Sequence, residues 1–418
     1  MDDPEAVIDV DHHAEGFIAD RHARYAELRR SCPVVFNEHY GGYWLVTDHA
    51  SVAEVARDNE TYAHRYEPEA VDGIDYGGIC GIPRPRGTPR QGVSEIDGPE
   101  HAALRRLLNP TLTPKAVDAL RPRMQAVATW FVDQIVAAGQ ADLVLDYTTP
   151  VPAVLTLEMM GMPAGNWRHY ADFFHAMSSY ERHEPEYQAA VGQFGEMWAE
   201  LAGFARHRRD HPADDLTTTL VTADLDGRPL SDDEVIGIMW NLVAGGLDTT
   251  TSLVSWALHH LGTHPVDRRR LIDEPELVPS AIEEFLRHVS PNETLTRTVT
   301  RAVDLGGRRL QAGDRVMTSW VSANHDEAVF ERPDEILIDR AVNPHLAFGV
   351  GGHRCIGAHL ARAEAEVMLR EVLVRLPDFE LDEAAFRPYP GNVVMTGVVS
   401  MPARFTPGEP IGPRLQPF

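Results

Sequence analysis

Lysine is almost absent from this chain of 418 residues, and positive charge as a whole is outweighed by negative charge. Lys115 is the single lysine, and 38 basic residues stand against 63 acidic ones, which gives a formal net charge of −25. Because nucleic-acid binding needs a basic surface, this balance argues against a nucleic-acid partner. It argues equally against general attraction to anionic membranes. Any local basic patch has to be built from arginine.

Long apolar runs and paired cysteines are missing too. No stretch of about 18 consecutive apolar residues occurs, so the sequence predicts no transmembrane helix and no membrane insertion. The acidic first residues lack the basic-then-apolar pattern of a secretory signal, so we expect a cytoplasmic protein. Cys32, Cys80 and Cys355 are too few and too scattered for a disulfide framework, which directs attention to metal binding or catalysis.

The apolar spacing that remains is typical of a mainly α-helical protein with small β-sheets. The longest predicted helix begins at a capping box formed by Ser231 and Glu234 and ends near His260, with the Gly245-Gly246 pair in its middle. No repeat or linker divides the chain, so residues 1–418 are predicted to form a single domain. The other predicted elements are helices at 17–31, 49–58, 100–108, 116–138, several within 150–208 broken near Pro163, Asn166 and Pro185, 278–289 and from Cys355 to about 375, a hairpin at 34–46, a long loop at 62–98, and strands at 299–305 and 315–320.

The most informative segment is the glycine-rich loop of residues 348–357, FGVGGHRCIG. Its cysteine, Cys355, stands just before a predicted helix, whose free N–H groups and dipole are expected to lower the pKa of the thiol. The glycines allow the backbone to pass close to a large flat group. A buried structural cysteine beside a turn is the plain alternative. A phosphate loop is disfavoured, because Arg354 stands where the third glycine of G-x-G-x-x-G belongs.

These residues closely resemble the haem-binding signature of the cytochrome P450 family, F-G-x-G-x-H-x-C-x-G. The resemblance implies the fold of that family, with haem b (iron protoporphyrin IX) between the long central helix and the cysteine loop and its helix. It also implies that Cys355 is the axial ligand of the iron, since a cysteine thiolate holds the haem of this family. Phe348 is then expected to shield the sulfur, and His353 to bind a haem propionate.

A second segment, AGGLDTT at 244–250, lies in the middle of the longest predicted helix. Polar residues in an apolar helix are costly unless they serve a function, and a threonine hydroxyl can bond back to a carbonyl one turn earlier. We therefore expect a locally widened helix. The segment resembles the oxygen-activating groove of the family, which implies that Asp248 and Thr249 are the catalytic acid and alcohol that pass protons to dioxygen. A simple helix kink is the alternative.

Further pairs acquire a role through the same resemblance. Glu284 and Arg287 match its E-x-x-R pair, which is expected to bind Arg340 and to be structural; taken alone, such a pair is usually a surface salt bridge. On the predicted helix at 100–108, His101 and Arg105 lie one turn apart and therefore share a face. The expected propionate ligands on the chain, besides His353, are His101, Arg105 and Arg297.

The function implied is that of a monooxygenase that oxidises a small organic substrate with dioxygen. Two electrons would come from a ferredoxin and an NAD(P)H-dependent ferredoxin reductase, with the enzyme a monomer. A peroxide-using haem-thiolate enzyme and a haem sensor or carrier without turnover are the alternatives, and the Asp248–Thr249 pair argues against both. The residues expected to form a basic docking face for the ferredoxin are Arg105, Arg106, Lys115, Arg354 and Arg362.

The substrate itself is not predicted beyond its polarity. Lining is expected from residues 62–98, about 166–190, the central helix and the segment at 394–396. A polar contact there would suit a hydroxyl, an amide or an amine. The side chains expected to line the substrate pocket are Asn241, Ala244, Asn292, Glu293, Val394 and Met395.

Overall fold

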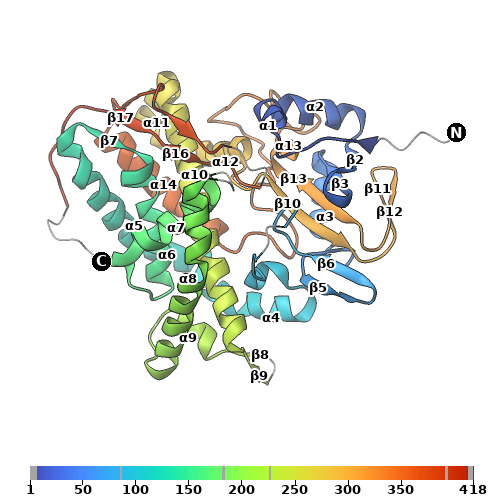
Figure 1. The fold of residues 1–418 in the computed structure, drawn as a ribbon. Helices are drawn as coiled ribbons and strands as arrows, with labels where there is room; N and C mark the ends of the chain where they lie inside the picture. The colour runs from blue at the N-terminus through green and yellow to red at the C-terminus, as the bar shows by residue number, and fades with distance from the viewer. Residues whose placement is uncertain (1–6, 85–86, 181–183, 226, 391–393, 413–417) are drawn as a thin grey trace.

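A computed structural model describes residues 7–84, 87–180, 184–225, 227–390, 394–412 and 418. Most helices, including the long helix α10, gather on one side of the molecule and the largest sheet lies on the other (Figure 1). The α-helices of the described residues are α1 (Glu15–Ala19), α2 (Arg21–Ser31), α3 (His49–Arg57), α4 (Gly98–Leu108), α5 (Pro114–Ile135), α6 (Pro150–Met159), α7 (Trp167–Ser179), α8 (Pro185–Asp210), α9 (Leu216–Val221), α10 (Asp232–Thr263), α11 (Pro265–Asp273), α12 (Val278–Val289), α13 (Trp320–Ala323) and α14 (Ala358–Arg375).

The β-structure is divided among small sheets. The largest described sheet has the order β1-β2-β3-β13-β10-β4, and the predicted hairpin is its antiparallel β2–β3 pair. Its strands are β1 (Val7–Ile8), β2 (Val34–Asn37), β3 (Tyr43–Val46), β13 (Arg315–Ser319), β10 (Thr294–Val299) and β4 (Tyr62–Ala63). The smaller sheets are β14 (Glu380–Leu381) with β17 (Pro402–Arg404) and β7 (Gln140–Asp142), β5 (Tyr66–Val71) with β6 (Ile74–Gly77), β8 (Asp224–Leu225) with β9 (Arg228–Pro229), β11 (Val303–Leu305) with β12 (Arg308–Leu310), and β15 (Arg387–Pro388) with β16 (Val398–Ser400).

Helix α10 occupies the centre of the helical side, as its apolar sequence predicts. The predicted capping box is present: Ser231 accepts from the backbone N–H of Glu234, and the Glu234 carboxylate accepts from the backbone N–H of Ser231. Helices α6, α7, α8, α12 and α14 all pack against α10. This cover explains why the helix stays continuous through its glycine pair, which contradicts the expected kink or widening.

The segment 62–98 is not the unstructured loop that its Gly, Pro and Arg content predicts. It contains β4, the β5–β6 hairpin and a 3₁₀ turn at Gly92–Glu95, although residues 85–86 lie outside the described chain. The fully buried Glu95 carboxylate organises it, because it pairs with Arg84 and accepts from the backbone N–H groups of Ile79 and Gln91. A buried ion pair, and not a pattern of apolar residues, thus organises this segment. Such a pair cannot be recognised from the periodicity of the sequence.

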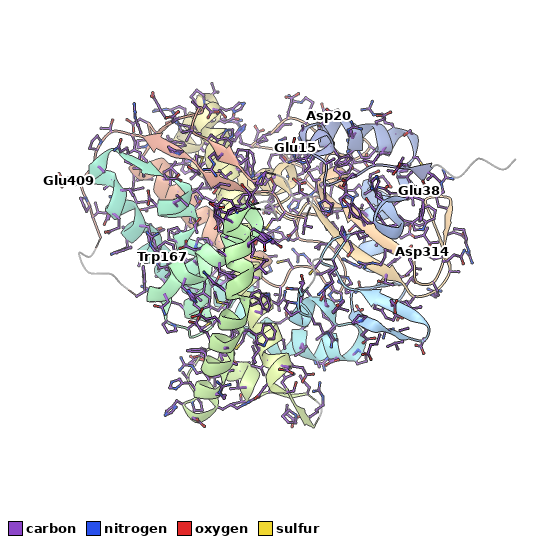
Figure 2. The ribbon with its side chains drawn as sticks, in the orientation of Figure 1. Glu15, Asp20, Glu38, Trp167, Asp314 and Glu409 are labelled. Carbon is purple, nitrogen blue, oxygen red and sulfur yellow. The ribbon has the colours of Figure 1, made fainter. Side chains whose placement is uncertain are left out.

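Other predicted bounds need smaller corrections. The helix predicted at 17–31 is divided into α1 and α2 at Asp20. The strand predicted at 299–305 is the last residue of β10 and the whole of β11, because the chain turns at 300–302. Exposed acidic side chains such as Asp20 and Glu38 lie on the outer surface of the sheet side (Figure 2). Among the described residues, no helix is both long and apolar enough to cross a bilayer.

Candidate functional site

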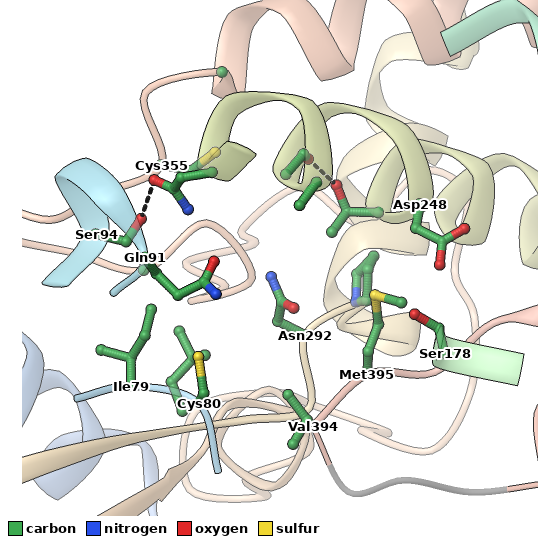
Figure 3. A pocket seen from close by; sticks show the side chains of 18 of the residues that line it. Ile79, Cys80, Gln91, Ser94, Ser178, Asp248, Asn292, Cys355, Val394 and Met395 are labelled. Atoms are coloured by element: carbon green, nitrogen blue, oxygen red, sulfur yellow. Dashed lines mark hydrogen bonds between the residues drawn. The ribbon is translucent and has the colours of Figure 1, made fainter. Parts of the chain in front are cut away.

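A cavity of about 930 Å³ lies between α10 and the glycine-rich loop of residues 348–357. Cys355 lines the cavity from the loop and Asp248 from the helix, and the segments at 79–80 and 394–395 close the opposite wall (Figure 3). The size is at the upper end of the range typical of small-molecule sites. The two motifs singled out in the sequence therefore face one space.

The cysteine loop is held in a compact turn by its own backbone. The N–H of Cys355 donates to the carbonyl of Phe348 over 2.8 Å, and α14 begins three residues further on. Gly351 has φ +83°, and a Cβ there would lie 2.6 Å from the carbonyl oxygen of Ala56, so only glycine fits between the loop and α3. The guanidinium of Arg362 stacks on the Phe348 ring at 4.5 Å. The loop thus presents its thiol in a fixed position.

The Cys355 thiol is exposed to the cavity but surrounded by protein. This enclosure raises the pKa of the thiol, while the N–H of Gly357 and the guanidinium of Arg105 oppose the rise. The prediction that the helix N-terminus lowers the thiol pKa is therefore wrong for the protein alone, because desolvation outweighs the helix.

Cationic side chains crowd together beside this thiol. The rings of His64 and His101 stack on opposite sides of His353, with centroids 3.4 and 3.7 Å from it. Asp97 accepts from His353 at 3.1 Å, whereas Arg105 donates to the carbonyl of Arg354 at 2.9 Å. The structure thereby brings together the predicted propionate ligands and adds His64, for which the sequence carries no spacing signal.

Two of these buried side chains each have one nitrogen without a partner. The Nε2 atom of His64 and the Nε atom of Arg297 make no hydrogen bond among the described residues. Burial lowers the pKa of His101 to about 4 and that of Arg297 to about 9, because desolvation disfavours the charged form of each group. An anionic ligand with several acceptor oxygens would satisfy them.

On α10 the polar residues face the cavity without breaking the helix. The Thr249 hydroxyl donates to the carbonyl of Gly245 over 2.8 Å, which confirms the predicted back-bond. A Cβ on Gly245 would meet nothing within 4 Å, whereas one on Gly246 would meet Thr156 of α6 at 2.5 Å. The first glycine therefore leaves open space, and the second allows two helices to pack closely.

The predicted structural pair is fully buried. Glu284 accepts from Arg287 at 2.8 and 2.9 Å and from Arg340 at 2.8 Å, and Asn343 and the N–H of Leu337 complete its shell. Burial raises the pKa of Glu284, but the hydrogen bonds from the two arginines outweigh burial and hold the pKa below its usual value. The pair is thus not a surface salt bridge.

The predicted pocket residues are all on the cavity except one. Asn241, Ala244, Asn292, Val394 and Met395 line it. Glu293 does not: its carboxylate is buried, and it pairs with Arg21 at 2.9 Å instead of facing the cavity. The polar and thiol-bearing lining residues that sequence reading did not single out include Glu15, Cys80, Gln91, Ser94 and Ser178.

Comparison with known proteins identifies this site. Residues 153–388 match the family described as Cytochrome P450. The nocardicin C N-oxygenase of Nocardia uniformis subsp. tsuyamanensis is 36% identical over 87% of this chain and 89% of its own length. The chain belongs to the cytochrome P450 family. This P450 is also 34% identical to the mycinamicin IV hydroxylase/epoxidase of Micromonospora griseorubida, over 86% of this chain and 88% of that protein.

Solved structures of similar proteins support the same family assignment. A cytochrome P450 of Mycobacterium marinum in complex with pseudoionone aligns with a TM-score of 0.85 at 29% identity, over 95% of this P450 and 98% of that chain. The fold is accordingly that of the family, and the protein is a haem-thiolate monooxygenase that binds haem b.

The residues present fit that haem. A free thiol faces the cavity, which suits an axial iron ligand. The partnerless nitrogens of His64 and Arg297, with His101 and His353 beside them, suit two propionate carboxylates.

Proposed function

We propose that this P450 oxidises a neutral organic molecule bearing a polar group such as a hydroxyl, an amide or a carbonyl, with electrons from a ferredoxin. The observation that carries the proposal is that the Cys355 thiol and the Asp248–Thr249 pair line one cavity from different elements. When bound, haem b supplies the redox chemistry that inserts one atom of dioxygen into the substrate and reduces the other to water. The protein supplies binding, orientation and protons.

Each site residue has a task in this proposal. Cys355 is the iron ligand, and Phe348 packs beside its sulfur. The propionates are held by His101, Arg105, Arg297 and His353, to which we add His64.

Asp248 and Thr249 move protons. The hydroxyl hydrogen of Thr249 is engaged by the Gly245 carbonyl, so its oxygen is left as an acceptor on the cavity side. Asp248 is the acidic group that α10 contributes to the described lining, and it is 5% exposed. A buried acid beside a fixed hydroxyl is a suitable proton donor to a reacting oxygen.

The charges of the lining favour a neutral substrate. Among the described lining residues the arginines are Arg105 and Arg297, and we assign both to binding the haem propionates. A carboxylate elsewhere in the cavity would lack a charged partner, which is costly in a desolvated site. Asn292, whose side chain makes no hydrogen bond to another described residue, points into the cavity and is suited to bind a neutral polar group (Figure 3).

A spectral titration of the ferric holoenzyme tests the substrate class. We expect pseudoionone, a neutral ketone, to shift the Soret band with a Kd at least tenfold below that of hexadecanoic acid, since only the acid buries an unpaired charge. Equal or tighter binding of hexadecanoic acid would refute the proposed neutral class.

The electron source is tested with the same ligand. Product formation with NADPH, a reductase and a ferredoxin should exceed that with hydrogen peroxide, because Asp248 and Thr249 are needed only where dioxygen is the oxidant. Equal turnover with peroxide would favour the peroxygenase alternative. A lack of substrate-dependent NADPH consumption, with the redox partners supplied, would favour the sensor or carrier.

The proposed ferredoxin face is narrower than the sequence suggested. Arg362 is paired with Glu283 at 2.6 and 2.7 Å, and Arg105 donates to the carbonyl of Arg354. Arg106, Lys115 and the side chain of Arg354 remain exposed, with no ion pair among the described residues. These three cationic side chains lie on the cysteine side of the haem site and are suited to attract an acidic partner.

Salt and charge reversal test this face. The electron-transfer rate should fall as ionic strength rises, since exposed charges are screened. Arg354→Glu should slow it several-fold, whereas Arg24→Glu, an exposed arginine on α2, should not. A salt-independent rate, or equal effects of the two variants, would refute the docking face. A single domain over residues 1–418, a monomeric state and a cytoplasmic location stay predictions.

A further inference from the structure

A buried tyrosine and a buried histidine meet the Asp248 carboxylate on the side away from the cysteine loop. The hydroxyl of Tyr389 donates to Oδ2 of Asp248 over 3.1 Å and lies 3.2 Å from Nδ1 of His175. The same Nδ1 is 3.8 Å from Oδ1 of Asp248. His175 comes from α7, Asp248 from α10 and Tyr389 from the segment after β15, so three distant parts of the chain meet here.

The direction of these hydrogen bonds follows from the donors available. A tyrosine has one hydroxyl hydrogen, and an ionised carboxylate accepts it more strongly than an imidazole nitrogen does. The Tyr389 hydrogen is therefore on Asp248, and the 3.2 Å contact requires His175 to donate through Nδ1. The three groups form an ordered chain in which every hydrogen points toward Asp248.

The two ends of this hydrogen-bonded chain, Asp248 and His175, differ in what they contact. The Asp248 end lines the cavity, although its carboxylate is turned toward the Ser178 side (Figure 3). At the other end, Nε2 of His175 is buried and has no hydrogen-bond partner among the described residues. Such an orphaned nitrogen is uncommon in a folded protein and calls for an explanation. A proton can be added to this nitrogen without breaking a hydrogen bond.

Burial shapes what each group can do. Tyr389 is 7% exposed, and burial together with the Asp248 charge raises its pKa well above the usual value. Its phenolate is therefore not formed, and the hydroxyl can only pass a proton on. His175 is 9% exposed and is of the residue type best suited to take up and release protons near neutral pH.

We infer that His175 and Tyr389 reload Asp248 with protons during turnover. A proton from water adds to Nε2 of His175; the Nδ1 proton then moves to the Tyr389 oxygen as the Tyr389 proton moves to Oδ2 of Asp248. The imidazole is left neutral with its hydrogen on Nε2, the hydroxyl is re-formed, and no electron moves. The inference rests on the proposed role of Asp248 as proton donor, and it makes His175 and Tyr389 positioning and relay residues that do not touch substrate.

Tyr389→Phe and His175→Gln test the relay, because each keeps the volume of the side chain but cannot carry the proton. Tyr170→Phe is the matched control, since Tyr170 is a buried tyrosine of α7 that donates to another carboxylate, Glu200, at 3.2 Å. Asp248→Asn is measured alongside. The reduced carbon monoxide spectrum of each holoenzyme shows that its haem site is intact.

With pseudoionone as ligand and a ferredoxin and its reductase as donors, both relay variants should lower kcat about tenfold with an unchanged ligand Kd. The ratio of rates in H₂O and D₂O should rise, and more NADPH should end as hydrogen peroxide. Tyr170→Phe should match the wild type. A second readout needs no turnover: in the diamagnetic ferrous carbon monoxide form, ¹⁵N spectra of labelled histidine should place the His175 hydrogen on Nδ1 and lose that preference in Tyr389→Phe.

The outcomes separate this inference from the proposal beneath it. If Asp248→Asn impairs turnover while Tyr389→Phe and His175→Gln behave like Tyr170→Phe, the relay is refuted and the role of Asp248 stands. If Asp248→Asn turns over normally, the proposed role of Asp248 fails and the relay with it. If Tyr389→Phe turns over faster than the wild type, the tyrosine restrains Asp248, which also overturns the relay. A His175 hydrogen found on Nε2 contradicts the hydrogen-bond direction independently of activity.

Discussion

Two buried carboxylates on the two sides of the haem seat have opposite surroundings. Glu284, on the cysteine side, is fully buried and accepts from two arginines, an asparagine and a backbone N–H. Asp248, on the substrate side, is 5% exposed and accepts from Tyr389, with His175 nearby. A carboxylate enclosed by cations stays ionised and fixes structure, whereas one that accepts from a hydroxyl beside an imidazole is placed to exchange protons with those groups. The site thus combines a rigid proximal half with a chemically responsive distal half.

Removing the buried Glu284 carboxylate from the rigid half should have the largest effect on the amount of folded holoenzyme. Glu284→Gln leaves Arg287 and Arg340 buried without their negative partner, which costs about 3–5 kcal/mol. We expect little folded holoenzyme, measured as haem content and thermal unfolding. Glu335→Gln is the control, because its exposed side chain pairs with Arg332 only at the surface. Normal haem content in Glu284→Gln would show that the pair is dispensable.

Removing the hydroxyl from the responsive half should leave the fold intact and damage the chemistry. Thr249→Val should lower product yield per NADPH about tenfold or more, because protons no longer reach the reacting oxygen in order. Thr263→Val is the matched control, since Thr263 makes the same back-bond in the same helix, to His259 at 2.9 Å. Similar yields from both variants would remove Thr249 from the proton path.

Acid should weaken the ion pair that Glu283 forms on the cysteine side of the site. Burial raises the pKa of Glu283, but hydrogen bonds from Arg362 and His345 outweigh burial and lower the pKa from 4.5 to about 2. A lowered folded-state pKa stabilises the fold above the unfolded value, and that contribution is lost as the pH falls from about 4.5 to about 2. Haem release on acidification should therefore be less steep in this window for Glu283→Gln. Identical curves would assign acid sensitivity to other groups.

The smallest effects should come from the polar lining. The Asn241 amide oxygen already accepts from Ser94 at 3.0 Å, whereas the Asn292 side chain has no described partner. Asn292→Leu should therefore weaken binding of pseudoionone about fivefold, and Asn241→Leu should weaken it less, as expected for one neutral hydrogen bond. Spectral titration measures both. Unchanged affinity in both variants would show that neither amide contacts the ligand.

The sequence predicted those parts of the site that lie in short motifs. The cysteine loop, the Asp248–Thr249 pair and the Glu284–Arg287 pair each depend on neighbouring residues, so their spacing is visible before folding. His64, His175 and Tyr389 were not predicted, because their roles arise only when distant segments meet. The Arg84–Glu95 pair is closer in sequence but has no motif spacing that marks it. Burial also reversed one electrostatic prediction, the pKa of Cys355, since solvent exclusion cannot be read from a motif.

The most direct test of the account is the reduced carbon monoxide spectrum of the wild type beside Cys355→His. The account predicts the red-shifted Soret band of thiolate-ligated haem for the wild type, and its replacement by the band of imidazole-ligated haem in Cys355→His. An imidazole-type band in the wild type, or a thiolate band that survives in Cys355→His, would contradict the assignment of Cys355 as the iron ligand.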